Sequence, residues 1–161
     1  MATLKSAQVT SYRVRGNWRG SDFTEYGTLN IASAPAVGDI WEMVQVPNGY
    51  AVESVYLDCD QLDSNATTPT ITLEVGDSGA ASRYIAASNV ARTGGVQVNN
   101  VAASTGYVNP IGNTNGNTGQ FSGGNAGATT IQVQVTAVAA TFKAGNVRLA
   151  VRLFQPSGQY T

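Results

Sequence analysis

The sequence contains no histidine, a single cysteine and few charged residues. Without histidine, catalysis by an imidazole base and metal sites built on imidazole are excluded. Cys59 alone makes neither an internal disulfide nor a zinc cluster. No apolar run approaches the roughly 18 residues that cross a bilayer, and the N-terminal residues lack the apolar stretch of a secretory signal. We therefore expect no cofactor, no metal and no membrane partner, and we expect the protein not to be an enzyme.

The charges are few but strongly segregated. Charged residues make up 12% of the chain and the net charge is −1, which argues against nucleic acid as a partner because phosphate binding needs a surplus of bases. Residues 1–20 carry four bases and no acid, residues 21–82 carry all ten acids and no base, and residues 83–161 carry five bases and no acid. Two explanations are open. Acidic and basic strands pair within one fold, or the basic N-terminal block contacts an acidic surface of another chain.

Residues that favour strands and turns dominate the composition. Valine occurs 18 times and threonine 17 times, whereas glutamate occurs four times and lysine and methionine twice each. β-Branched residues suit a pleated surface, while the 18 glycines and 13 asparagines suit tight turns. The sequence therefore predicts an all-β fold. We expect an antiparallel two-sheet sandwich, jelly-roll-like, with a closed barrel as the alternative.

Alternation of apolar and polar residues locates the strands. The clearest alternation covers 131–137 and 147–153, where Val133, Val135, Leu149 and Val151 are expected in the core. Residues 40–46 and 50–60 are predicted to form a hairpin through the turn Pro47-Asn48-Gly49. Weaker signals predict strands at 27–31, 70–75, 82–87 and 96–98, one helical turn at 87–92, and a long Gly/Asn-rich loop at 112–127.

The N-terminal part of the chain is expected to differ from the rest. We predict an N-terminal arm and irregular segment at residues 1–37, followed by the sandwich domain at 38–161. Alternation in residues 9–15 fits either a strand or an extended arm. Because the arm combines positive charge with apolar side chains, it is expected to contact a partner through Leu4, Lys5, Tyr12, Arg13, Arg15, Trp18 and Arg19.

Two further clusters could carry chemistry. Asp58, Asp60 and Asp63 stand where a strand runs into a loop; a calcium site is one interpretation, but the spacing departs from that of an EF-hand, so a solvated acidic loop is favoured. Cys59, between them, shares a strand face with apolar neighbours and is predicted to be a small core residue. Trp18, Phe23 and Tyr26 could stack on a sugar or base, but capping one end of the sandwich or a subunit contact is favoured.

The order of motifs resembles a known family. The hairpin at 39–52 leads into Val55-Tyr56-Leu57-Asp58-Cys59-Asp60, then Val75-Gly76-Asp77, Arg83-Tyr84-Ile85 and a final strand at 145–151. Over about residues 38–154, this layout is similar to that of the small β-sandwich structural proteins of tailed bacteriophages, in particular head decoration (cement) proteins.

The resemblance implies a non-enzymatic virion protein that is made in the host cytoplasm and bound to the outer capsid surface. Its partners would be the major capsid protein and other copies of itself, often as a homotrimer. A carbohydrate- or receptor-binding module of a phage tail or fibre is the alternative.

Overall fold

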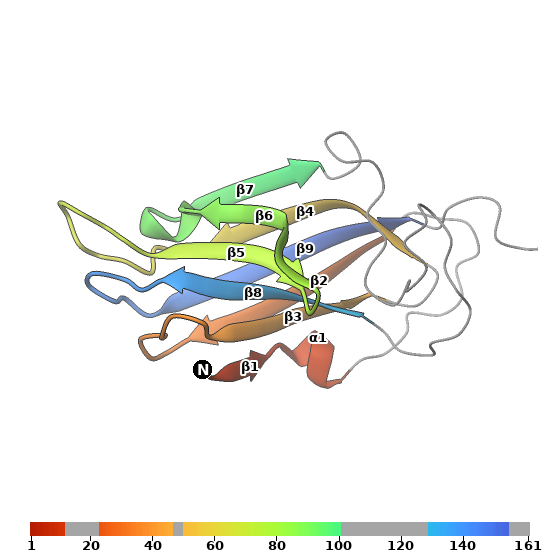
Figure 1. The fold of residues 1–161 in the computed structure, drawn as a ribbon, viewed down its shortest axis with the longest axis horizontal. Coiled ribbons are helices and arrows are strands. Elements are labelled where there is room, and N and C mark those ends of the chain that lie inside the picture. The colour runs from red at the N-terminus through yellow and green to blue at the C-terminus, as the bar shows by residue number, and fades with distance from the viewer. Residues whose placement is uncertain (12–22, 47–49, 101–128, 155–161) are drawn as a thin grey trace, which may run out of the picture.

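The computed structural model describes residues 1–11, 23–46, 50–100 and 129–154, which form two β-sheets stacked face to face (Figure 1). The first sheet has the strand order β1-β3-β8-β5-β6 and the second has the order β2-β9-β4-β7. The bounds of the strands are β1 Thr3–Lys5, β2 Phe23–Ile31, β3 Ile40–Val46, β4 Ala51–Cys59, β5 Thr72–Asp77, β6 Ala80–Ser88, β7 Gly95–Asn100, β8 Thr129–Ala137 and β9 Gly145–Phe154. The predicted all-β sandwich is confirmed.

The core lies between the two sheets and contains the side chains that the alternation pointed inward. Val133, Val135, Leu149 and Val151 are fully buried, as predicted. Cys59 is a free thiol, 2% exposed, in the same core, so its predicted role as a small core residue is confirmed. In β8 and β9 the residues of one face are buried in this core, which explains why their sequences alternate so clearly.

The predicted hairpin of residues 40–46 and 50–60 is wrong. β3 belongs to the first sheet, where it pairs with β1 and β8, whereas β4 belongs to the second, where it pairs with β9 and β7. The turn residues 47–49 lie outside the described residues. A Pro-Asn-Gly sequence favours a reversal of the chain. It does not decide whether the two strands become neighbours in one sheet or lie in two sheets whose apolar faces meet across a core.

The N-terminal segment is more regular than predicted. Phe23–Ile31 forms a full strand that pairs with β9 along its whole length, where only a short strand at 27–31 was expected. Where the alternation in residues 9–15 predicted a strand or an extended arm, Ala7–Thr10 forms a short helix, α1, capped by Ser6, whose Oγ accepts from the Val9 N–H. The same hydroxyl donates to the Met43 carbonyl of β3, so capping and docking are achieved by one side chain. Residues 12–15 lie outside the described residues.

The predicted division of the chain into an N-terminal segment at 1–37 and a sandwich domain at 38–161 stays a prediction. β1 and β2 fall in the first part, and both pair with strands that fall in the second. The helical turn predicted at 87–92 is present as a 3-10 turn, η1, at Val90–Arg92. The predicted loop at 112–127 lies outside the described residues. No helix in the described part of the chain is long and apolar enough to cross a membrane.

Candidate functional site

The outer face of the second sheet collects exposed apolar side chains. Tyr26 of β2, Tyr56 of β4 and Val96 and Val98 of β7 are 64%, 37%, 60% and 53% exposed. The register places Ala150 of β9 between Tyr26 and Tyr56, and Val98 on the far side of Tyr56. The residues Tyr26, Ala150, Tyr56 and Val98 therefore form one row across all four strands, which we call the apolar row.

The apolar row borders a shallow hollow of about 500 Å³. Its middle is low because Ala150 is the smallest side chain in the row, so the two tyrosines stand on either side of it. Arg148 and Arg152, which flank Ala150 along β9, line the same hollow. Such a concave, mainly apolar surface with polar groups at its margin has the general character of a ligand-binding surface.

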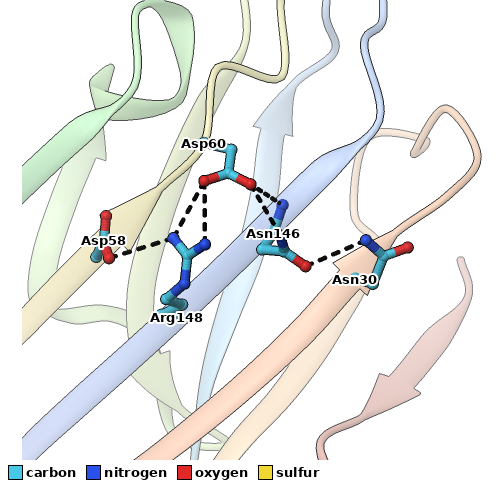
Figure 2. Close-up of polar contacts among 5 residues, drawn as sticks. All are labelled: Asn30, Asp58, Asp60, Asn146 and Arg148. Carbon is cyan, nitrogen blue, oxygen red and sulfur yellow. Dashed lines mark hydrogen bonds and ion pairs between the residues drawn. The ribbon is translucent and has the colours of Figure 1, made fainter.

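A polar network borders this row on one side (Figure 2). The Arg148 guanidinium contacts Asp58 Oδ2 at 3.3 Å and Asp60 Oδ1 at 3.1 Å. Asp60 Oδ2 accepts from the backbone and side-chain amides of Asn146 at 2.8 and 2.9 Å. Asn30 on β2 then donates to Asn146 Oδ1 at 3.1 Å. The network spans β2, β9 and β4, and the loop that follows β4.

Hydrogen bonds within the network favour the charged forms of Asp60 and Arg148. The backbone N–H of Asn146, followed by its side chain and Arg148, holds the pKa of Asp60 below its ordinary value. The bond to Asp60 in turn raises the pKa of Arg148. The Asp60 carboxylate and the Arg148 guanidinium therefore stay charged and paired at neutral pH, so the network forms a fixed polar border.

Asp63 contradicts the prediction of a solvated acidic loop. Its carboxylate is fully buried and accepts hydrogen bonds from the backbone N–H groups of five residues: Asn65, Thr70, Ile71, Ala140 and Thr141. Burial works to raise its pKa, but the N–H groups, Thr141 first, outweigh that effect and lower it. Asp63 thus fastens two loops together, while Asp58 and Asp60 face Arg148. Within the described residues, no three His, Cys, Asp or Glu side chains gather as a metal site.

The hairpin of β5 and β6 brings together two motifs of the family resemblance, Val75-Gly76-Asp77 and Arg83-Tyr84-Ile85. Asp77 is buried and accepts from the backbone N–H groups of Gly79 and Ala80. It also accepts from the Tyr84 hydroxyl at 3.2 Å and pairs with Arg83 Nε at 2.8 Å. The Val-Gly-Asp and Arg-Tyr-Ile segments are therefore two sides of one hairpin, with a single carboxylate at its centre.

The residues predicted to bind a partner are only partly described. Leu4 is 42% exposed on β1, and Lys5 forms an ion pair with Glu42 at 3.0 Å. Tyr12, Arg13, Arg15, Trp18 and Arg19 lie outside the described residues. The structure does not bring Leu4 and Lys5 to the hollow, because β1 belongs to the other sheet. Their role in binding stays a prediction.

The aromatic pair at the hollow differs from the predicted cluster. Phe23 is half-buried and packs edge-on against Tyr50, with ring centroids 4.8 Å apart, whereas Tyr26 is exposed and stands across Ala150 from Tyr56. Sequence reasoning missed Tyr56, although a signal existed: it alternates with Val55 and Leu57, and so lies on the face that also carries Asp58.

The charge blocks meet within the chain. Lys5 of the first block pairs with Glu42, and Arg83, Arg148 and Arg152 of the last block pair with acids of the middle block. For these residues acidic and basic strands are thus neighbours in one fold, whereas Arg13, Arg15 and Arg19 of the first block lie outside the described residues, so contact of that block with another chain stays a prediction.

Neither a family model nor a curated protein sequence matches the chain. Solved structures do match, among them chains of two phage capsids. A chain of the capsid of Ralstonia phage GP4 has 24% identity over 98% of this chain and 100% of that chain, with a TM-score of 0.73; this likeness shows the fold. A chain of the cyanophage Pam1 capsid asymmetric unit has 32% identity over 89% of this chain and 92% of that chain, with a TM-score of 0.68. With that identity over nearly the full length of both chains, the protein belongs to the family of phage capsid structural proteins that the Pam1 chain represents.

Proposed function

We propose that this protein is a decoration (cement) protein, which binds the outer surface of a phage capsid shell and stabilises the head. The observation that carries the proposal is the 32% identity, over nearly the whole chain, to a chain of a capsid asymmetric unit. A single small sandwich of this kind suits an added component, because it offers exposed binding surface around a self-sufficient core.

The proposed partners are the major capsid protein and further copies of this chain in a homotrimer. Each contact would be shallow, and the oligomer would hold the shell by avidity. The basic block at residues 1–20 supplies Arg13, Arg15 and Arg19, whose planar guanidinium groups suit pairing with carboxylates on the shell. We propose that synthesis in the host cytoplasm precedes this binding, and that the role is non-enzymatic.

The test is addition of the purified protein to shells assembled from the major capsid protein alone. We expect saturable binding to the shell and a higher temperature of shell disruption, followed by light scattering. Replacing Arg13, Arg15 and Arg19 with alanine should weaken binding most at low salt, whereas Lys143→Ala, at an exposed position, should leave it unchanged. Absence of binding by the unaltered protein would overturn the proposal.

One observation favours a second function, binding of carbohydrate at the shell or tail. Tyr26 and Tyr56 are exposed on either side of Ala150, in a hollow that Arg148 and Arg152 also line. Aromatic faces beside charged hydrogen-bonding groups suit a sugar ring. Titration with maltohexaose, cellohexaose and chitohexaose, read by tyrosine fluorescence, tests this function, with Tyr26→Ala as the variant expected to lose binding. If none of the three shifts the emission, this second function is rejected for those sugars.

A further inference from the structure

In the described part of the chain, three of the four strands at the sheet edges carry features that prevent pairing with another chain. β1 has three residues, one of which is the charged Lys5. β6 is irregular in register against β5 and carries the exposed Arg83. β2 contains the buried charge Glu25 and runs so close to β3 that a Cβ on Gly27 would lie 2.0 Å from the Met43 carbonyl oxygen. Short length, charge, bulges and covering are the usual ways in which proteins block an open edge.

β7 has none of these features. Its six residues, Gly-Val-Gln-Val-Asn-Asn, include neither a charge nor a proline. Its register with β4 runs without a shift from Gly95 to Asn100. Within the described residues, β7 pairs with β4 alone, and Figure 1 shows it along the upper margin of the sandwich. The strand therefore offers a regular, uncharged edge.

Side chains on the two faces of β7 also favour pairing, because one face is bonded to β6 and the other exposes two valines. On its inner side, Asn99 donates a hydrogen bond from its side chain to the Tyr84 carbonyl of β6. On its outer side, Val96 and Val98 are 60% and 53% exposed. Two exposed valines at alternate positions of an extended edge are suited to cross-strand pairing with other β-branched side chains.

We propose that β7 pairs antiparallel with β7 of a second copy of this chain, across a twofold axis, so that two four-stranded sheets join into one. The strand is self-complementary, because an uncharged edge meets no like-charge repulsion when it faces itself. This contact differs from a threefold contact within a trimer, so it would link protomers of neighbouring oligomers. It does not depend on the proposed binding to the shell.

The apolar pattern selects the register of this pairing. A twofold axis perpendicular to the sheet places residues of equal face opposite each other. When Gln97 lies opposite the second copy's Gln97, Val96 of each copy faces Val98 of the other, and all four valines are paired. A shift by one residue along each strand would place Val98 opposite itself and leave Val96 facing Asn100. The first register continues the apolar row across the contact, and apolar pattern is what fixes register in sheets.

Such a contact is small. Stable protein interfaces bury at least about 1,200 Å² in total, more than one pair of short strands provides. The contact is therefore expected to be weak between single protomers and to gain strength when several copies are held side by side. Disulfide trapping detects weak contacts, and it also reports the register.

The experiment uses single-cysteine additions at β7 in the full chain. Mixing Val96→Cys with Val98→Cys under oxidised glutathione should yield a disulfide-linked dimer, while each variant alone should not. Gln97→Cys should form a dimer by itself. Ser82→Cys, exposed on the guarded strand β6, is the matched control. Cys59 is common to all variants and is buried, which raises the pKa of its thiol to about 12, so it should not react.

A second substitution separates pairing from mere proximity. Gln97→Cys combined with Val98→Lys should lose the dimer, whereas Gln97→Cys combined with Val98→Thr should keep it, with circular dichroism unchanged in both. Absence of disulfide dimer from Gln97→Cys and from the mixture would overturn the proposal. Dimer from Val98→Cys alone would overturn the register. Shell binding is measured separately, so a failure here leaves the decoration proposal standing, and the reverse also holds.

Discussion

Asp60 and Asp63 lie three residues apart, yet they belong to two different kinds of region. Asp63 lies fully buried between the loop that follows β4 and the loop that joins β8 to β9, with five backbone N–H groups around it. Asp60 sits beside the outer face of the second sheet, where its side chain is 40% exposed and contacts Arg148 and Asn146. The same residue type serves as an internal clamp in one place and as a surface border in the other.

The difference shows where this fold gains stability and where it is free to vary. A buried carboxylate that satisfies several amides cannot be removed without leaving those donors unpaired. An exposed ion pair is screened by water and salt and contributes little. We infer that the two loops joined by Asp63 contribute to the stability of the fold, and that the outer face of the second sheet is available for partners.

The sharpest test of this comparison is Asp63→Ala set against Asp60→Ala. Loss of the Asp63 carboxylate leaves five backbone donors without an acceptor, so we expect the free energy of unfolding to fall by about 4 kcal/mol. Asp60→Ala should cost about 1 kcal/mol or less. Urea denaturation followed by circular dichroism measures both. Equal losses in the two variants would show that the two regions do not differ.

A second large effect is expected at Gly76 in β5. A Cβ at this position would lie 2.0 Å from the Ala80 carbonyl oxygen and 2.4 Å from the backbone of Ala81. Because these are backbone atoms of the paired strand, the β5–β6 hairpin around Asp77 would have to open. Gly76→Ala should therefore reduce the free energy of unfolding by about 3 kcal/mol. Gly79→Ala, at the exposed tip of the same hairpin, is the control, and a comparable loss there would contradict this explanation.

Sequence patterns predicted where the strands lie in the chain better than which strands pair with one another. Valines and leucines of β8 and β9 alternate because one face of each strand is buried, and that information is local. The assignment of β3 and β4 to different sheets is not local, because a reversing turn serves a hairpin and a crossover between sheets equally well. Only the second half of β2, at 27–31, was predicted, because Gly27, which looks like a strand breaker, is required by the close approach of the Met43 carbonyl.

The candidate site was predicted even less well, for a related reason. The apolar row takes one residue from each of four strands that are far apart in sequence, so only the register reveals it. Asp63 was misjudged because an acid in a polar loop usually faces water, and its five amide donors come from two separate segments. The charge blocks, in contrast, did indicate ion pairs between strands.

Acid should distinguish the two regions as well. The folded-state pKa of Asp63 lies below that of the unfolded chain, so its contribution is complete above about pH 4 and is lost as pH falls below that value. A single group of this kind contributes at most about 1.4 kcal/mol per pH unit. Urea denaturation of the unaltered protein and of Asp63→Asn between pH 5 and pH 2 tests this, and the variant should show the shallower dependence. Parallel curves would mean that Asp63 is not the group responsible.

The smallest effect is expected at Arg148, on the outer face. Its guanidinium is 41% exposed and contacts both Asp58 and Asp60, so Arg148→Ala removes two surface ion pairs. Asp60 keeps its bonds to Asn146, which holds the loop in place without the arginine. We therefore expect a loss of about 0.2–1 kcal/mol in the free energy of unfolding, shrinking as salt is raised. Urea denaturation at two salt concentrations measures this, with Asp63→Ala as the comparison whose loss should not depend on salt. A loss at Arg148 as large as that at Asp63 would make the outer face part of the structural framework, and the surface would no longer be free to serve partners alone.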